Sequence, residues 1–85
     1  MKYELVSARR AVRDIEKHND QVRRRIKKAL ETYRDDPCRY LEKLSNPELG
    51  SFQFRMGDYR VVFDLDGQKI VVLRVGHRRA IYRGI

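Results

Sequence analysis

The sequence predicts a small α+β domain in which one strand and a helical hairpin precede a three-stranded antiparallel meander. Apolar residues repeat at helical spacing between residues 8 and 33, and from residue 52 onward they alternate with polar residues at strand spacing. Two glycine-containing turns divide this second region into three short strands. The strands are therefore expected to form a small twisted sheet with the helices on one face.

The first half of the chain is expected to supply the N-terminal strand and the helical hairpin. Residues 2–6 form the strand, and the Ser7 hydroxyl is placed to cap a helix that begins at Ala8. Asn19 or Asp20 is placed to cap the second helix. The inward-facing positions are Ala8, Ala11, Val12 and Ile15 in the first helix and Val22, Ile26, Ala29, Leu30 and Tyr33 in the second.

The connection between the hairpin and the sheet is expected to be irregular. Pro37 closes the second helix because proline cannot continue it. Residues 39–50 mix three leucines with turn-forming residues, which is typical of a loop that tucks its apolar side chains under a sheet.

The two hairpins of the meander fix which residues share a face. If both loops have two residues, Met56 lies opposite Tyr59 and Leu65 lies opposite Gln68. The face expected to form the core carries Phe52, Phe54, Met56, Tyr59, Val61, Phe63, Ile70 and Val72. The other face carries Gln53, Arg55, Arg60, Val62, Asp64, Lys69, Val71, Leu73 and Val75.

On this second face, the register places Arg55 directly opposite Arg60, whereas Asp64 and Lys69 form a favourable pair. Like charges across a ladder are destabilising by up to about 1 kcal/mol, so the arginine pair suggests that an anion such as phosphate sits between them. The alternative is that both side chains extend into water at little cost.

The composition predicts one domain, residues 1–85, with a polyanionic partner. Lys and Arg number 20 against 12 acidic residues, and the net charge is +8 with a pI near 10.1. Such a field favours nucleic acid over a merely soluble or heat-adapted surface. A chain of this size hides only about 60–65% of its unfolded surface, so its core is thin.

Several classes of protein are not expected. The single cysteine, Cys38, cannot close an intrachain disulfide, and residues 1–6 lack a signal-peptide core, so a cytoplasmic location is expected. No apolar run approaches the roughly 18 residues of a membrane span. One Cys with His18 and His77 gives no clustered ligand set, so neither a metal nor another cofactor is expected.

The residues that follow the third strand suggest metal-independent cleavage of RNA. Gly76 ends the apolar run, and His77, Arg78, Arg79 and Tyr82 follow it. In this chemistry a base deprotonates the ribose 2′-hydroxyl, arginines hold the charge on the attacked phosphate, and an acid protonates the leaving oxygen. Singly, a histidine at a strand end or an aromatic lid over the core is the more common role for His77 and Tyr82.

The chain resembles the RelE/ParE toxin superfamily, and within it the RelE-type mRNA interferases that depend on the ribosome. The resemblance covers nearly the whole chain. It is carried by Arg55, by GDYRVVF at residues 57–63 and by VGHRRAIY at residues 75–82, with a leucine and glycine lead-in at residues 44–50.

The resemblance implies a toxin that enters the ribosomal A site, cuts the message there, and is silenced by a RelB-like antitoxin that wraps the sheet. By position, Arg55 and Arg60 would contact the scissile phosphate, with Arg78 assisting. Tyr82 matches the family's catalytic tyrosine, and His77 is the second candidate for proton transfer. A glutamine, Gln53, stands where related toxins have a lysine, and it leaves the identity of the base open.

Two other functions are compatible with the same fold. A ParE-like protein would inhibit DNA gyrase by binding, without chemistry of its own, and an inactive regulator would bind nucleic acid through its basic surface. If the RelE-type reading holds, ribosomal RNA would contact the basic face of the second helix. The residues expected to bind RNA outside the reacting groups are Gln53, Arg79, Arg23, Arg24, Lys27 and Lys28.

Overall fold

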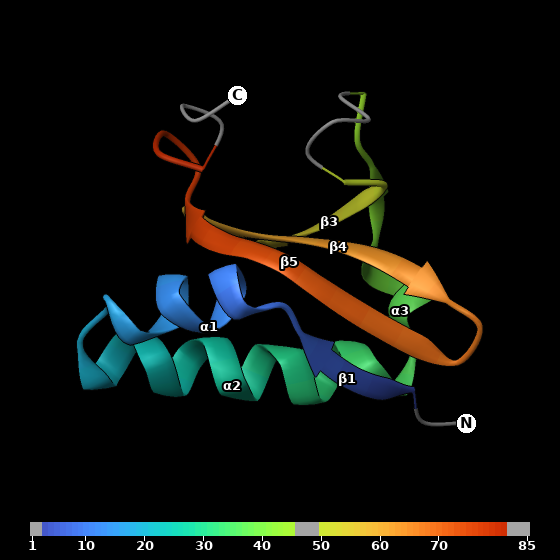
Figure 1. Ribbon diagram of the computed structural model, residues 1–85, viewed down its shortest axis with the longest axis horizontal. Coiled ribbons are helices and arrows are strands. Elements are labelled where there is room, and N and C mark those ends of the chain that lie inside the picture. Colours follow the sequence, from blue (N-terminus) through green and yellow to red (C-terminus); the bar gives the residue numbers. More distant parts are fainter. Residues whose placement is uncertain (1–2, 46–49, 82–85) are drawn as a thin grey trace.

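A five-stranded mixed sheet packs one face against two helices in the computed structural model, which describes residues 3–45 and 50–81 (Figure 1). The strand order is β1-β5-β4-β3-β2. The elements are β1 (Glu4–Ser7), α1 (Arg9–Glu16), α2 (Asp20–Asp35), α3 (Pro37–Tyr40), β2 (Glu42–Lys43), β3 (Phe52–Met56), β4 (Tyr59–Asp66) and β5 (Lys69–His77). The predicted α+β class, with helices on one face of the sheet, is confirmed.

The meander gains one strand at each edge. β1 pairs in parallel with β5, from Glu4 opposite Lys69 to Ser7 opposite Val72. β2 pairs with β3, and it lies in the segment that the sequence predicted to be a loop. That prediction was wrong because a strand of two residues shows no alternation. Pro37 also begins α3, since proline suits the first turn of a helix.

The start of the helical hairpin differs from the prediction. Ser7 belongs to β1 and caps nothing, because Ala8 N–H donates to the Val72 carbonyl (2.8 Å) and keeps the chain in the sheet. Asn19 does cap α2, accepting a hydrogen bond from Val22 N–H at 2.9 Å. In α1 the predicted apolar stripe is confirmed at Ala11, which is buried, and at Ile15, which packs against the core, but Val12 is 41% exposed and Asp14 is buried.

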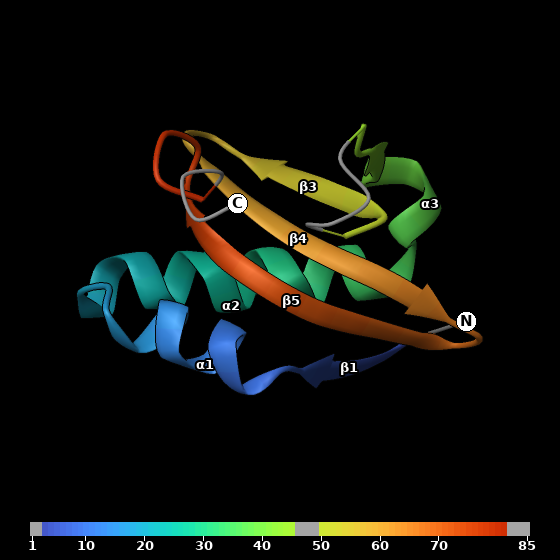
Figure 2. The same ribbon diagram turned by 45° about the horizontal axis from the view of Figure 1, so that its top comes forward.

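The main core lies between the sheet and α2 (Figure 2). Its centre is an aromatic stack in which the Tyr33 and Phe54 rings are 4.3 Å apart and the Phe54 and Phe63 rings are 4.1 Å apart. Ile26 and Leu30 continue the same face of α2, and both are buried. This packing fixes α2 against β3 and β4, so the opposite face of those strands points away from the helices.

The first hairpin has the predicted register and the second does not. Met56 lies opposite Tyr59 as expected. In the second hairpin the last pair before the loop is Asp66 with Lys69, not Leu65 with Gln68. Gly67 therefore takes the first loop position with φ of 59°, as Gly57 does in the first hairpin with φ of 60°. The predicted Asp64–Lys69 pair does not form.

A bulge in β5 moves its last residues to the other face. Val62 lies opposite Arg74 and Phe63 opposite Val72, so Leu73 is the extra residue. As a result Val75 is buried in the main core, not on the second face where strict alternation placed it. The bulge thus changes which face of the sheet each residue from Arg74 to His77 takes.

The second face of the sheet is partly covered by its own small cluster. Val62 and Ile81 are its buried members, and Leu44 and Leu73 pack against them. Gly50 lies tightly over the same place, where a Cβ atom would stand 2.6 Å from Val62 Cγ1. The sequence predicted apolar residues on this face and leucines of residues 39–50 under the sheet, but not that Ile81 covers Val62.

Replacing Gly50 by alanine is expected to lower the free energy of unfolding by about 1–3 kcal/mol, because the added methyl overpacks this cluster. Urea denaturation followed by circular dichroism measures the change. Gly76→Ala is the matched control, because its Cβ would meet nothing closer than Ile81 Cβ at 3.7 Å. Equal losses in the two variants would contradict the tight fit at Gly50.

Among the described residues, no helix is long and apolar enough to cross a membrane.

Candidate functional site

Two arginines lie side by side where β3 and β4 meet at their shared turn. Arg55 is directly opposite Arg60, as predicted. Its neighbours Phe54 and Met56 are buried against the helices, so by alternation both arginines lie on the other side of the sheet. We call this side, defined by Arg55 and Arg60, the arginine face.

Each of these arginines has a partner within the protein. Arg55 Nε forms an ion pair with Glu42 Oε2 at 2.9 Å, and both side chains are exposed, at 62% and 44%. Arg60 Nη1 donates to the carbonyls of Gly57 (2.7 Å) and Tyr59 (2.8 Å). Exposed ion pairs contribute about 0–1 kcal/mol, so an incoming phosphate can exchange for Glu42 at little cost.

Tyr33 and Gln53 stabilise the surroundings of Arg55. The Tyr33 hydroxyl donates to the Arg55 carbonyl at 3.0 Å. Burial, and then the neighbouring Tyr40, raise the pKa of Tyr33 above its ordinary value of 10.0, which keeps that hydroxyl protonated and able to donate. Gln53 donates from Nε2 to Glu42 Oε2 at 3.3 Å, so the glutamine at the expected lysine position orients the carboxylate that pairs with Arg55.

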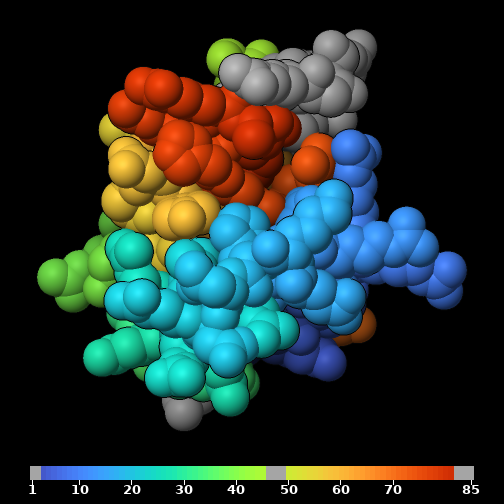
Figure 3. Space-filling model, turned by 90° about the vertical axis from the view of Figure 1, so that its left-hand side faces the viewer, coloured from blue at the N-terminus to red at the C-terminus, as the bar shows by residue number. Residues whose placement is uncertain are grey.

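The turn after β5 brings a third arginine to the same end of the sheet. Arg78 N–H donates to the Asp58 carbonyl at 2.7 Å, and Arg78 Nε lies 3.7 Å from Asp58 Oδ1. Buried Ile81 anchors the turn, with its N–H donating to the His77 carbonyl. Figure 3 shows this turn in red, beside the yellow β3–β4 turn and above the light-blue end of α1.

His77 lies on the helix side of the sheet, away from Arg55 and Arg60. It pairs with Tyr59, and Gly76 is the residue opposite Arg60. Its ring packs edge-on against Tyr59 at 5.8 Å, and its Nδ1 accepts a hydrogen bond from Arg79 N–H at 3.2 Å. The expectation that His77 shares one face with the arginines is therefore not met, and Tyr82 lies outside the described residues.

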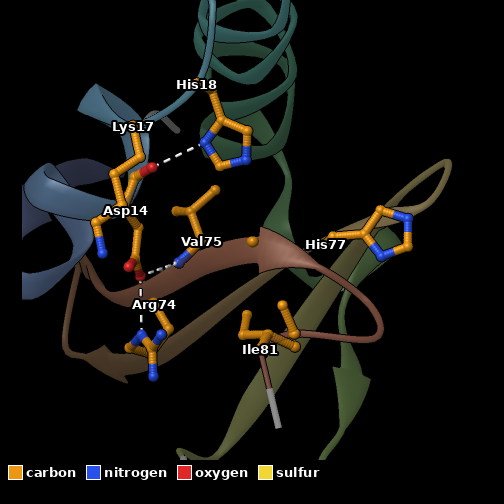
Figure 4. Close-up of a pocket in the computed structure, with 9 residues that line it drawn as sticks. Asp14, Lys17, His18, Arg74, Val75, His77 and Ile81 are labelled. Carbon is orange, nitrogen blue, oxygen red and sulfur yellow. Dashed lines mark hydrogen bonds and ion pairs between the residues drawn. The ribbon is translucent and has the colours of Figure 1, made fainter. Parts of the chain in front are cut away.

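A cavity of about 290 Å³ opens where α1 meets the free edge of β5, beyond the end of β1 (Figure 4). We call it the β5-edge cavity. Asp14 Oδ2 accepts from Arg74 Nε at 2.8 Å and from Val75 N–H at 3.0 Å. The cavity is lined by Asp14, Lys17, His18, Arg74, Val75, Gly76, His77, Ala80 and Ile81.

Sequence reasoning missed Asp14, His18 and Arg74. Two signals were present: Arg74 is the one cation in the apolar run of residues 70–75, and Asp14 lies three residues after Ala11, on the inner side of α1. A lone cation in a strand and a carboxylate on an apolar helix side together indicate a buried ion pair.

The basic residues of α2 are exposed and lie on the far side of the sheet from the arginine face. Arg23, Arg24, Lys27 and Lys28 follow the outer side of α2, whose inner side packs on the core. Arg23 also forms an ion pair with Asp20. Arg79 is exposed in the turn after β5. The protein therefore has two separate cationic surfaces.

The described residues hold no group of three or more His, Cys, Asp or Glu side chains that could bind a metal ion.

Comparisons with known proteins assign this small sheet on two helices to a family. The sequence profile of a family described as the ParE toxin of the type II toxin-antitoxin system parDE matches residues 5–82. The chain belongs to this family, within the RelE/ParE superfamily. It is a type II toxin. No curated protein sequence matches it significantly.

Solved structures of RelE toxins share the fold. The RelBE2 toxin–antitoxin complex of Mycobacterium tuberculosis matches with a TM-score of 0.82 and 27% identity, over 92% of this chain and 100% of that one. A mutant of the Escherichia coli toxin RelE in the free state matches with a TM-score of 0.75 and 26% identity, over 98% and 93%. The RelE–RelB complex of Pyrococcus horikoshii, at 20% identity and a TM-score of 0.74 over 94% and 99%, supports the fold alone.

Proposed function

We propose that this toxin is a metal-independent, RelE-type endoribonuclease that cuts mRNA in the ribosomal A site through attack by the ribose 2′-hydroxyl. The observation that carries the proposal is the pairing of Arg55 with Arg60 on a face that the helices do not cover. Two like charges placed directly across a ladder favour an anion between them. The resemblance to RelE-type mRNA interferases makes RNA the preferred polyanion.

In the proposed reaction the arginines supply electrostatic stabilisation. The scissile phosphate takes the place of Glu42 at Arg55 and gains the guanidinium of Arg60 opposite. Arginine presents a planar fork of donors that matches two phosphate oxygens. Donors placed where charge develops in the transition state accelerate such reactions most, and Arg78 adds a third cation at the same end of the sheet.

Proton transfer is assigned first to Tyr82 and second to His77. The hydrogen bond from Arg79 N–H occupies Nδ1 of His77, so a neutral ring carries its proton on Nε2 and is set up to donate. In that state Nε2 donates a hydrogen bond to a phosphate oxygen, whereas protonation of the leaving oxygen requires a ring protonated on both nitrogens, so Tyr82 comes first. Because His77 projects on the helix side, it would act on RNA that passes around the end of β5.

The dependence on the ribosome follows from the exposure of the site. Arg55 and Arg78 are half or more exposed, so few groups of the toxin itself orient a flexible RNA. The ribosome would hold the message, and Arg23, Arg24, Lys27 and Lys28 on α2 would bind ribosomal RNA through its phosphates. A RelB-like antitoxin is the proposed protein partner, because relatives of known structure are RelB–RelE complexes, and the cytoplasm is the proposed location.

The second candidate function is inhibition of DNA gyrase by binding, which the match to the ParE family favours. Two assays run side by side separate the candidates: primer extension on translating ribosomes and supercoiling of relaxed plasmid by gyrase. We expect new message ends within the A-site codon and undiminished supercoiling. Inhibited supercoiling with an intact message would reverse the assignment, and no effect in either assay would leave only a nucleic-acid-binding regulator.

A further inference from the structure

The β5-edge cavity has a cationic side chain that is already held in place. Arg74 pairs with Val62, two residues along β4 from Arg60, so its Cβ lies on the arginine face. Its guanidinium then reaches around the free edge of β5 to Asp14. The ion pair uses Nε and leaves the two terminal nitrogens out of that contact, as Figure 4 shows.

Asp14 acts as a fixed support for this arginine. Among the described residues, no strand pairs with β5 beyond Val72 on its β1 side, so the N–H of Val75 would lack a strand partner there. The carboxylate of Asp14 accepts from that N–H and from Arg74 together, in a largely buried position. A guanidinium anchored in this way loses little side-chain freedom when it binds an anion.

The charges around the cavity favour an anion. Lys17 and Arg74 supply two cations against the one carboxylate of Asp14, whose Oδ2 already accepts two hydrogen bonds. His18 donates from Nδ1 to the Asp14 carbonyl at 2.8 Å, which holds its ring at the wall of the cavity. Gly76, which lines the cavity, lies directly opposite Arg60 on the neighbouring strand. The backbones of these two residues are therefore about one strand spacing, roughly 4.8 Å, apart.

We propose that the β5-edge cavity binds a second phosphodiester of the RNA chain, adjacent to the one held by Arg55 and Arg60. Lys17 and Arg74 are its cationic ligands, and Asp14 is a positioning residue that holds Arg74. This inference rests on the proposed function, because it takes RNA as the substrate. It adds a path for the RNA chain, which would cross the arginine face and then pass around the edge of β5.

The test measures binding of a short 2′-O-methyl RNA oligonucleotide, which has the phosphates but not the attacking hydroxyl. Fluorescence anisotropy over a series of salt concentrations gives the slope of log K against log salt. Each phosphate contact with a single strand contributes about 0.7 to that slope. We therefore expect Lys17→Gln to reduce its magnitude by about 0.7, and Lys17 is exposed, so the variant should fold.

Lys69→Gln is the matched control, because it removes the same charge from the far end of β5, about 23 Å along the strand from Gly76 at the cavity. It should leave the slope unchanged. An unchanged slope in Lys17→Gln, or no binding of the oligonucleotide by the wild type, would overturn the assignment. So would inorganic phosphate that shifts the amide resonances of Val75 and Gly76 as strongly as the oligonucleotide does, because the cavity would then be a site for free anions.

Cleavage on ribosomes is scored separately. If the wild type cuts the message but Lys17→Gln keeps the full salt slope of oligonucleotide binding, the second phosphate site is refuted and the proposed function stands. If the expected slopes are found but the wild type does not cut the message, the proposed function is refuted and the binding site stands.

Discussion

Replacing Arg55 and Arg60 together by alanine is expected to abolish cleavage of ribosome-bound message and to leave the fold intact. Each lost donor to the charged transition state costs about 10² to 10³ in rate, so the pair should cost about 10⁴ or more. The fold should survive because, within the described part of the chain, Arg55 forms an ion pair with the exposed Glu42 and Arg60 bonds to turn carbonyls. Single-turnover primer extension measures the rate, and far-ultraviolet circular dichroism the fold.

The matched control for this pair is the replacement of Arg9 and Arg10 by alanine. It removes the same charge from exposed positions of α1, so it separates the loss of a local contact from the loss of overall positive field. We expect the control to cut at close to the wild-type rate. Undiminished cleavage by the Arg55 and Arg60 variant would refute the assignment of the scissile phosphate to this face.

Asp14→Ala is expected to cost about 3–5 kcal/mol of stability, the largest effect of any single substitution considered. It leaves the guanidinium of Arg74 largely buried without its carboxylate and the N–H of Val75 without an acceptor. For a chain of 85 residues this is a large part of the total, which for a domain of this size is about 4–13 kcal/mol. Urea denaturation gives the value.

Two further variants show whether the loss comes from the buried ion pair. Asp14→Asn keeps an oxygen that can accept from Val75 N–H and should cost less than Asp14→Ala. Asp20→Ala breaks an exposed pair with Arg23 and should cost less than about 1 kcal/mol. A loss at Asp14→Ala no larger than that at Asp20→Ala would contradict the structural role given to Asp14.

The sequence was sufficient for the parts of the fold that depend on local patterns. The alternation around Phe54 and the Gly57–Asp58 turn predict the first hairpin, and with it the Arg55–Arg60 pair, because a two-residue loop fixes the register. The two helices followed from their apolar spacing, which α2 keeps over its whole length. These features need no information about distant residues.

The parts that were wrong or missing depend on contacts between distant segments. No residue marks the bulge at Leu73, which arises where β5 must satisfy β4 on one side and α1 on the other, and it moved Val75 into the core. The second hairpin shifted because Gly67, not Asp66, takes the loop position with positive φ. The edge strand β1 takes its place only by pairing with β5, far along the chain, and β2, of two residues, is too short to show a pattern of its own.

The candidate site follows the same division. The arginine pair was predictable from register, whereas the position of His77 was not, because the bulge in β5 determines which face each later residue takes. The Asp14–Arg74 pair joins residues 60 positions apart, and neither residue alone indicates it. The sequence therefore indicated that arginines and His77 gather at this end of the sheet, but not how they divide between its two faces, and it did not indicate Asp14 or Arg74.

The central claim, attack by the 2′-hydroxyl on a ribosome-bound message, is tested most directly by a message with one 2′-deoxynucleotide. The substitution is placed on the 5′ side of the linkage that the toxin cuts in the A-site codon. The account predicts that the all-ribose message is cut there, leaving a 2′,3′-cyclic phosphate, and that the deoxy-substituted message stays intact at that linkage. Cleavage at the same linkage despite the missing hydroxyl would contradict it.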